Sequence, residues 1–138
     1  MIVEGRGLVR SDILGQELVN LACTAAMHGH IRCLYVLKEM GCNFDETNKA
    51  FDNPAHWAAR FGHEHCLLFL KDQGCNFDQV NNCGETLAFL AADNGHEACL
   101  CFLKENGCDL NQADNIGQTP VHRAAKNGHY NCLGLLKH

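Results

Sequence analysis

Residues 117–129 read Gly-Gln-Thr-Pro-Val-His-Arg-Ala-Ala-Lys-Asn-Gly-His, and the dipeptide that ends this stretch decides the fold. Gly-His occurs four times in the 138 residues, at 29–30, 62–63, 95–96 and 128–129. The spacing is 33 residues each time, and paired alanines, a cysteine and a lysine recur in the same register. A fixed period of this length is typical of a protein built from stacked structural repeats.

The quoted stretch predicts a short helix that begins at Thr119-Pro120. A threonine side chain accepts hydrogen bonds from the free N–H groups of a first helical turn, and proline fits the first helical position. Val121 and the paired alanines follow at helical spacing, and Gly128 is suited to a left-handed C-cap. A second helix is predicted after each Gly-His pair. The turn-rich segments 81–84 and 114–117 predict tight turns between successive helix pairs.

These residues closely resemble the ankyrin repeat, whose 33-residue unit carries a Thr-Pro-Leu-His-x-Ala pattern. The resemblance covers roughly residues 16–138. It implies an all-α fold, an ankyrin-repeat solenoid of stacked helix-turn-helix pairs linked by β-hairpin-like turns, in one domain over residues 1–138. The repeats are expected at approximately 15–47, 48–80, 81–113 and 114–138, with residues 1–14 as an N-terminal extension or cap. The first repeat diverges most, as a terminal cap often does.

Two aromatic residues depart from the repeat pattern. Phe51 stands where Gly84 and Gly117 stand in the later repeats, at a position that favours positive φ. We therefore expect the turn that contains Phe51 to differ in shape from the other two. Phe89 replaces a histidine that, by family resemblance, hydrogen-bonds the neighbouring turn backbone, so we expect packing to hold the turn of the third repeat.

Composition excludes several function classes. The net charge of -5 disfavours nucleic-acid binding, which requires clustered lysine and arginine. No uncharged stretch approaches the roughly 18 residues of a membrane span, and the N-terminus lacks the apolar region of a secretion signal. We expect an intracellular protein, in the cytoplasm or alternatively the nucleus. No nucleophile with a base, paired carboxylates or phosphate-binding loop stands out, so neither catalysis nor a cofactor is expected.

The ten cysteines and nine histidines invite a redox or zinc interpretation, which the period disfavours. Stacked repeats lie about 8 to 10 Å apart, whereas a disulfide needs Cα atoms within about 7 Å. The in-register cysteines are therefore interpreted as small apolar packing residues in a reducing compartment. The histidines of the Gly-His pairs are interpreted as making one structural hydrogen bond per repeat. His28 with His30, or His63 with His65, lacks evident further metal ligands.

Function is expected at positions that the period does not fix, because these form the exposed surface of a solenoid. By resemblance, the partner-binding surface is a concave groove of turn tips and first helices. Its residues are Lys49, Asp52, Arg60, Phe61, Val80, Asn82, Cys83, Glu85, Asp93, Asn94, Asn115, Ile116, Gln118, Lys126 and Asn127. Apolar members and the pair Arg60-Phe61 suggest a protein partner. Arg60, Asp93 and Lys126 alternate in sign along the groove, which favours a partner of complementary pattern.

The leading hypothesis is therefore a non-catalytic protein-binding scaffold or adaptor. One alternative is modification, because Leu103, Asp109, Leu110 and Asn111 match the spacing by which ankyrin repeats resemble substrates of an asparaginyl hydroxylase. Another alternative is a thiol- or zinc-responsive sensor that uses Cys83, at a predicted turn tip, with Cys101 and nearby histidines.

The last repeat keeps the apolar pattern of the interior repeats up to its end. A terminal repeat normally has a polar outer face. We therefore expect that the chain is a fragment of a longer protein, or that further repeats or another chain cover the C-terminal face.

Overall fold

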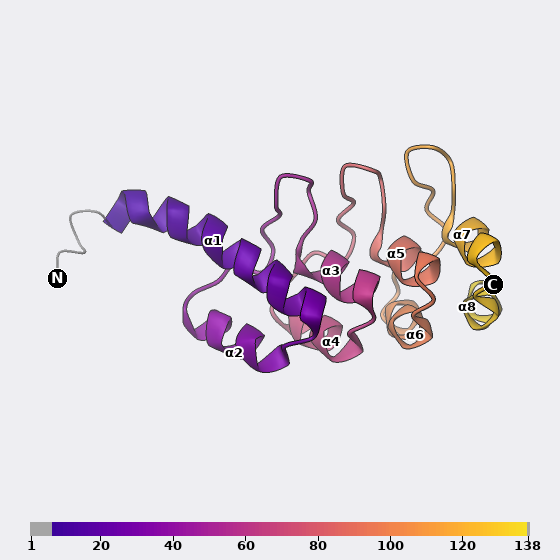
Figure 1. Cartoon of the computed structure of the whole chain (residues 1–138), viewed down its shortest axis with the longest axis horizontal. Coiled ribbons are helices and arrows are strands. Elements are labelled where there is room, and N and C mark those ends of the chain that lie inside the picture. The colour runs from indigo at the N-terminus through magenta and orange to yellow at the C-terminus, as the bar shows by residue number, and fades with distance from the viewer. Residues whose placement is uncertain (1–6, 138) are drawn as a thin grey trace.

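The computed structural model describes residues 7–137, with side chains from residue 15 onward, and in this range its regular structure is entirely helical. Figure 1 shows the helices stacked as pairs in sequence order, with the long connecting loops projecting on one side. The elements are α1 (Gly7–His28), α2 (Ile31–Glu39), α3 (Pro54–Phe61), α4 (Glu64–Asp72), α5 (Leu87–Asp93), α6 (Glu97–Glu105), α7 (Pro120–Asn127) and α8 (Tyr130–Leu136). The expected all-α stack of helix pairs is confirmed.

The first helix of each later repeat begins at a side-chain cap. Asn53 and Thr119 cap α3 and α7, each with proline at the start of the helix and a histidine that returns a bond to the cap. Thr86 accepts from the Phe89 N–H at 3.0 Å, but Phe89 has no group to return that bond. The cap of α5 is therefore one-sided.

The core is elongated, with one layer per repeat. Alanines on the facing sides of α1, α3 and α5 are fully buried, including Ala26, Ala59 and Ala92. Small side chains let these first helices approach closely, and leucines such as Leu67 and Leu100 fill the layer beneath them. Each repeat thus buries its apolar face against its neighbours.

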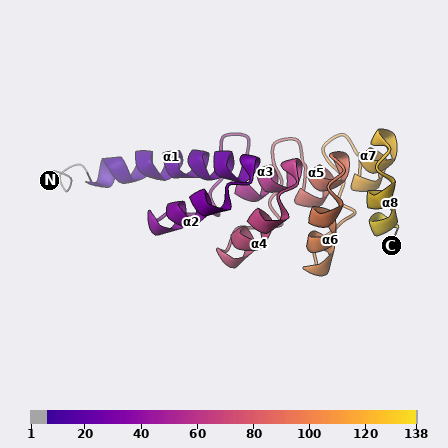
Figure 2. The same ribbon diagram turned by 60° about the horizontal axis from the view of Figure 1, so that its bottom comes forward.

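The first repeat differs from the expected boundary. Helix α1 runs for 22 residues, so the boundary predicted at residue 15 falls inside a continuous helix. Residues 7–14 are the beginning of α1, whereas residues 1–6 of the expected extension lie outside the described residues. Figure 2 shows the N-terminal part of α1 extending beyond α2. Within residues 7–137, no helix has both the length and the apolar character that a bilayer span requires.

The turn at Phe51 has the same shape as its counterparts, so the expected difference was wrong. Phe51 donates its backbone N–H to the Asn48 carbonyl at 3.0 Å, as Gly84 does to Asn81 at 2.9 Å. Its φ of 63° lies in the left-handed region that normally takes glycine. Hydrogen bonds around the turn impose this conformation on Phe51, at a cost of about 1 to 2 kcal/mol.

The Gly-His histidines link each repeat to the one before it, which confirms their structural interpretation for three of the four. Each Nε2 contacts a backbone carbonyl 36 residues earlier: His63 to Met27 at 2.9 Å, His96 to Arg60 at 2.9 Å and His129 to Asp93 at 3.1 Å. The glycine of the preceding pair leaves room for the imidazole, because a Cβ at Gly29 would lie 2.6 Å from Nδ1 of His63. Among the described residues no repeat precedes His30, and its side chain is exposed.

The interpretation of the in-register cysteines holds for Cys66, Cys99 and Cys132, which are buried, and Cys75 is also buried. It is wrong for Cys33, which is exposed. The reason is positional: Cys33 lies on the outer side of the first repeat, where no other described repeat packs.

Candidate functional site

A hollow of about 410 Å³ lies between the turn tips of the third and fourth repeats and their first helices. Seven of the residues predicted to bind a partner line it: Asn82, Cys83, Glu85, Asp93, Asn115, Ile116 and Gln118. Three further lining residues, Phe89, Asp114 and Arg123, were absent from the predicted set. The structure therefore gathers about half of the predicted surface into one concave feature.

Side-chain hydrogen bonds shape the two tips that border the hollow. Oδ1 of Asn81 accepts from the backbone N–H groups of Cys83 and Glu85, both at 3.0 Å. Oδ1 of Asp114 likewise accepts from Ile116 at 3.1 Å and Gln118 at 2.8 Å. These local bonds hold each tip in one conformation.

The two tips are also joined to each other. The Asn115 N–H donates to the Cys83 carbonyl at 2.9 Å, and Nδ2 of Asn115 donates to the Asn82 carbonyl at 2.7 Å. Beside this junction the Ile116 side chain is 78% exposed. A tip fixed on both sides therefore presents an apolar side chain to solvent.

Two large apolar residues, Phe89 and Ile116, stand among the mostly polar residues that line the hollow. Phe89 is buried, yet it contributes to the wall of the hollow. Its counterparts one repeat away are His56 and His122, so this repeat offers a ring without hydrogen-bonding groups where its neighbours carry an imidazole. The sequence signal for Phe89 was this departure from the repeat.

Charge pairs within the chain use most of the charges predicted to face a partner. Nε of Arg123 lies 2.7 Å from Oδ1 of Asp93, and Nη1 donates to the Gln118 side chain at 3.2 Å. Nη2 of Arg60 lies 3.8 Å from Asp52 and 3.7 Å from Glu85. Two of the three charges that alternate along the groove, Arg60 and Asp93, are thus paired inside the molecule.

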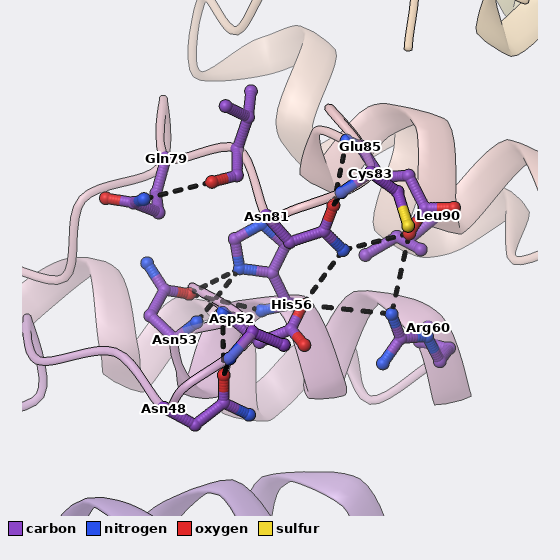
Figure 3. A network of polar contacts seen from close by, with 12 residues as sticks. Asn48, Asp52, Asn53, His56, Arg60, Gln79, Asn81, Cys83, Glu85 and Leu90 are labelled. Carbon is purple, nitrogen blue, oxygen red and sulfur yellow. Dashed lines mark hydrogen bonds and ion pairs between the residues drawn. The ribbon is translucent and has the colours of Figure 1, made fainter. Parts of the chain in front are cut away.

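Asp52 is the clearest error in the predicted surface, because only 5% of it is exposed. Figure 3 shows the polar network that encloses it, between the tips of the second and third repeats. Nδ2 of Asn81 donates to Oδ1 of Asp52 at 3.0 Å and to Oε1 of Glu85 at 2.9 Å. Oδ1 of Asn48 accepts from the Asp52 N–H at 3.0 Å. Asp52 is a structural residue, and polar contacts rather than packing hold the turn of the third repeat.

His56 lies beside this network and is fully buried. Its Nδ1 accepts from the Asn53 N–H at 3.0 Å, which closes the cap of α3. Burial lowers the pKa of His56 to about 4, and the nearby Asp52 carboxylate offsets only part of this effect. His56 is therefore neutral at physiological pH, and its role here is structural.

The remaining predicted residues lie outside the hollow. Phe61 is exposed and stacks on the half-buried Trp57, with ring centres 6.2 Å apart. The Arg60 guanidinium covers the same tryptophan at 4.5 Å from the ring centre. Val80 is half-buried, and the others are exposed: Lys49, Asn94, Lys126 and Asn127.

The thiols are mostly poor nucleophiles. Burial raises the pKa of Cys23, Cys75 and Cys99 to about 12, so these side chains stay protonated at neutral pH. Cys101 is half-buried and its thiol donates to Oε2 of Glu105 at 3.6 Å, whereas Cys83 is exposed at its turn tip. Among the described residues, no three histidine, cysteine, aspartate or glutamate side chains are grouped closely enough to hold a metal ion.

Comparison with known families gives one result. The sequence model described as Ankyrin repeats (3 copies) matches residues 19–114 and also residues 55–138. None of the curated proteins compared with the chain matches it.

Proposed function

The chain belongs to the ankyrin-repeat family, whose repeats are generally protein–protein interaction modules, and we propose that it binds a protein partner through its groove of turn tips and first helices. Ankyrin-repeat domains are typically non-catalytic, and no catalytic family matches the chain. On this proposal the domain acts as a scaffold or adaptor and performs no chemistry of its own.

The observation that carries the proposal is the hollow between the third and fourth repeats. It combines a border held by side-chain hydrogen bonds with the exposed side chain of Ile116, and Phe89, which is only 2% exposed, lies beneath it. Interfaces between proteins typically place an apolar contact at the centre of a polar rim, and the amides and carboxylates around Ile116 supply such a rim. A partner segment with an apolar side chain flanked by hydrogen-bonding groups would fit this lining.

The experiment compares Ile116→Glu with Leu68→Glu. Leu68 lies on α4 and is 50% exposed, so it provides a matched apolar-to-acidic change away from the hollow. We expect some proteins that wild type and Leu68→Glu capture from cell extract to be lost with Ile116→Glu. If Ile116→Glu retains every partner of the wild type while its circular dichroism is unchanged, the hollow is not the binding site.

We propose Asn111 as a target of hydroxylation, which is compatible with a scaffold role. Asn111 is exposed in the segment that leads to the fourth tip, and its backbone N–H donates to Oδ1 of Asp109 at 2.9 Å. The test is mass spectrometry of the peptide that contains Asn111, from protein made in cells. Addition of one oxygen atom, absent from the Asn111→Ala protein, supports the proposal, and an unmodified peptide contradicts it.

A further inference from the structure

The outer face of the first repeat carries an apolar groove of about 430 Å³ between α1 and α2. Leu21 contributes from α1, and Cys33 and Val36 contribute from α2. All three side chains are exposed, and the groove is lined almost entirely by apolar atoms. This surface is separate from the hollow between the third and fourth repeats.

Comparison with equivalent positions in the later repeats shows which surface of the repeat forms this groove. Leu21 is 51% exposed, whereas Leu87, two periods later, is 1% exposed. Val36 is 54% exposed, whereas Phe69, one period later, is 4% exposed and contacts Tyr35 and Phe44 of the preceding repeat. The groove is thus the surface that, in every later repeat, receives the repeat before it. In the first repeat the groove keeps apolar side chains, and the described residues leave it uncovered.

The fourth repeat carries the complementary half of the same contact, which no described residue covers. Ala125 is exposed, although its counterparts Ala26, Ala59 and Ala92 are fully buried. A Cβ at Gly128 would meet nothing, whereas at Gly95 it would meet the imidazole of His129. In the part of the chain that the structure describes, no imidazole contacts the Lys126 carbonyl, which holds the register position of the carbonyls that accept from His63, His96 and His129.

We propose that two copies of this chain associate head to tail, with the α1–α2 groove of one copy on the α7–α8 face of the next. The exposed His30 of the first copy then reaches Lys126 O and Gly128 of the second, as His129 reaches Asp93 O and Gly95 within one chain. Leu21 and Cys33 lie against the exposed Ala125. The two faces differ, so the contact is not self-complementary, and repeated association extends an open chain of copies.

The test uses two lysine variants, one for each face. Leu21→Lys alters the groove and Ala125→Lys alters the opposite face, and both positions are exposed in a single copy, so neither change should unfold it. Leu68→Lys, on the outer side of α4, is the matched control. Sedimentation velocity of the full chain is measured over a wide range of protein concentration, and circular dichroism verifies folding.

We expect the sedimentation coefficient of wild type and Leu68→Lys to rise with concentration, and that of each face variant to stay constant. An equimolar mixture of Leu21→Lys and Ala125→Lys retains one intact pair of faces. It should therefore form a species of two chains and none larger. A wild type that stays monomeric overturns the proposal, as does association lost in only one face variant, or a mixture that forms no pair. None of these outcomes bears on partner binding by the hollow.

Discussion

The junction between the second and third repeats and the junction between the third and fourth use the same register positions for opposite purposes. At the first, which we call the closed junction, Asn81 bridges the carboxylates of Asp52 and Glu85, and both Asn81 and Asp52 are buried. At the second, which we call the open junction, Gln118 is the register counterpart of Asp52 and Glu85 and carries no charge. Arg123 pairs there with Asp93 on the rim of an open hollow. A few residues outside the repeat pattern therefore determine whether a junction forms buried polar contacts between repeats or leaves a concave surface exposed to solvent.

Acidification should break the closed junction first. Because burial lowers the pKa of His56 to about 4 from an ordinary value of 6.5, the unfolded chain binds a proton that the folded chain does not bind between these values. Lowering the pH from about 6.5 towards 4 therefore reduces the free energy of unfolding, and this loss is complete below about pH 4. It amounts to at most about 3 kcal/mol.

Urea unfolding at a series of pH values measures this contribution. His56→Asn should flatten the profile between about pH 6.5 and pH 4, and His122→Asn, which alters the exposed counterpart, is the matched control for loss of a capping histidine. Burial also lowers the pKa of His96, but His96 is present in all three proteins, so its contribution cancels. Parallel stability profiles for wild type and His56→Asn would contradict the assignment of this loss of stability to His56.

Removing Asn81 should cost more than removing its counterpart at the open junction. Asn81→Ala leaves the buried Asp52 carboxylate and two backbone N–H groups without their partner, which should lower the free energy of unfolding by about 2 kcal/mol. Asp114→Ala removes two bonds from a half-buried site and should cost about 1 kcal/mol. Denaturation monitored by circular dichroism compares the two. Equal losses would mean that enclosure of Asp52 contributes nothing.

The ion pair at the open junction should be stronger than the ion pair at the closed junction. Arg123 contacts Asp93 at 2.7 Å, whereas Arg60 lies 3.7 Å from Glu85. All four side chains are partly solvated, so double-mutant cycles should give a coupling of about 1 kcal/mol for Arg123 with Asp93 and about 0.3 kcal/mol for Arg60 with Glu85. A larger coupling for Arg60 would show that charge attraction, rather than Asn81, joins the closed junction.

The smallest expected effect is a gain in folding stability from a substitution at the turn tip of the second repeat. Phe51→Gly relieves the left-handed strain but adds freedom to the unfolded chain, for a net stabilisation of about 0.5 kcal/mol. Gly84→Ala, at the equivalent position of the third repeat, should destabilise, because its Cβ would meet the backbone nitrogen of Asn115 at 2.8 Å. Urea unfolding of both variants tests whether the tips share one geometry. A loss of stability in Phe51→Gly would contradict the inference that Phe51 is strained in the left-handed conformation.

Periodicity in the sequence is sufficient to predict the helix pairs, the caps and the contacts of the Gly-His histidines. It does not predict burial at the turn tips, because burial there depends on a neighbour one period away: Asp52 is enclosed only because Asn81 faces it. Arg123 was missed although it differs from Trp57 and Leu90 at the same register position. Its pairing with Asp93 depends on side-chain direction, which the spacing of residues does not specify.

The histidine contacts between repeats also constrain how the domain responds to acid. A carbonyl oxygen only accepts, so Nε2 of His63, His96 and His129 must carry the hydrogen in each contact. Both the neutral tautomer with Nε2–H and the doubly protonated ring satisfy that requirement. Each of these hydrogen bonds can therefore form whether or not the imidazole is charged, but burial disfavours the charged form of His96, so acid destabilises the stack at His96 as well as at His56.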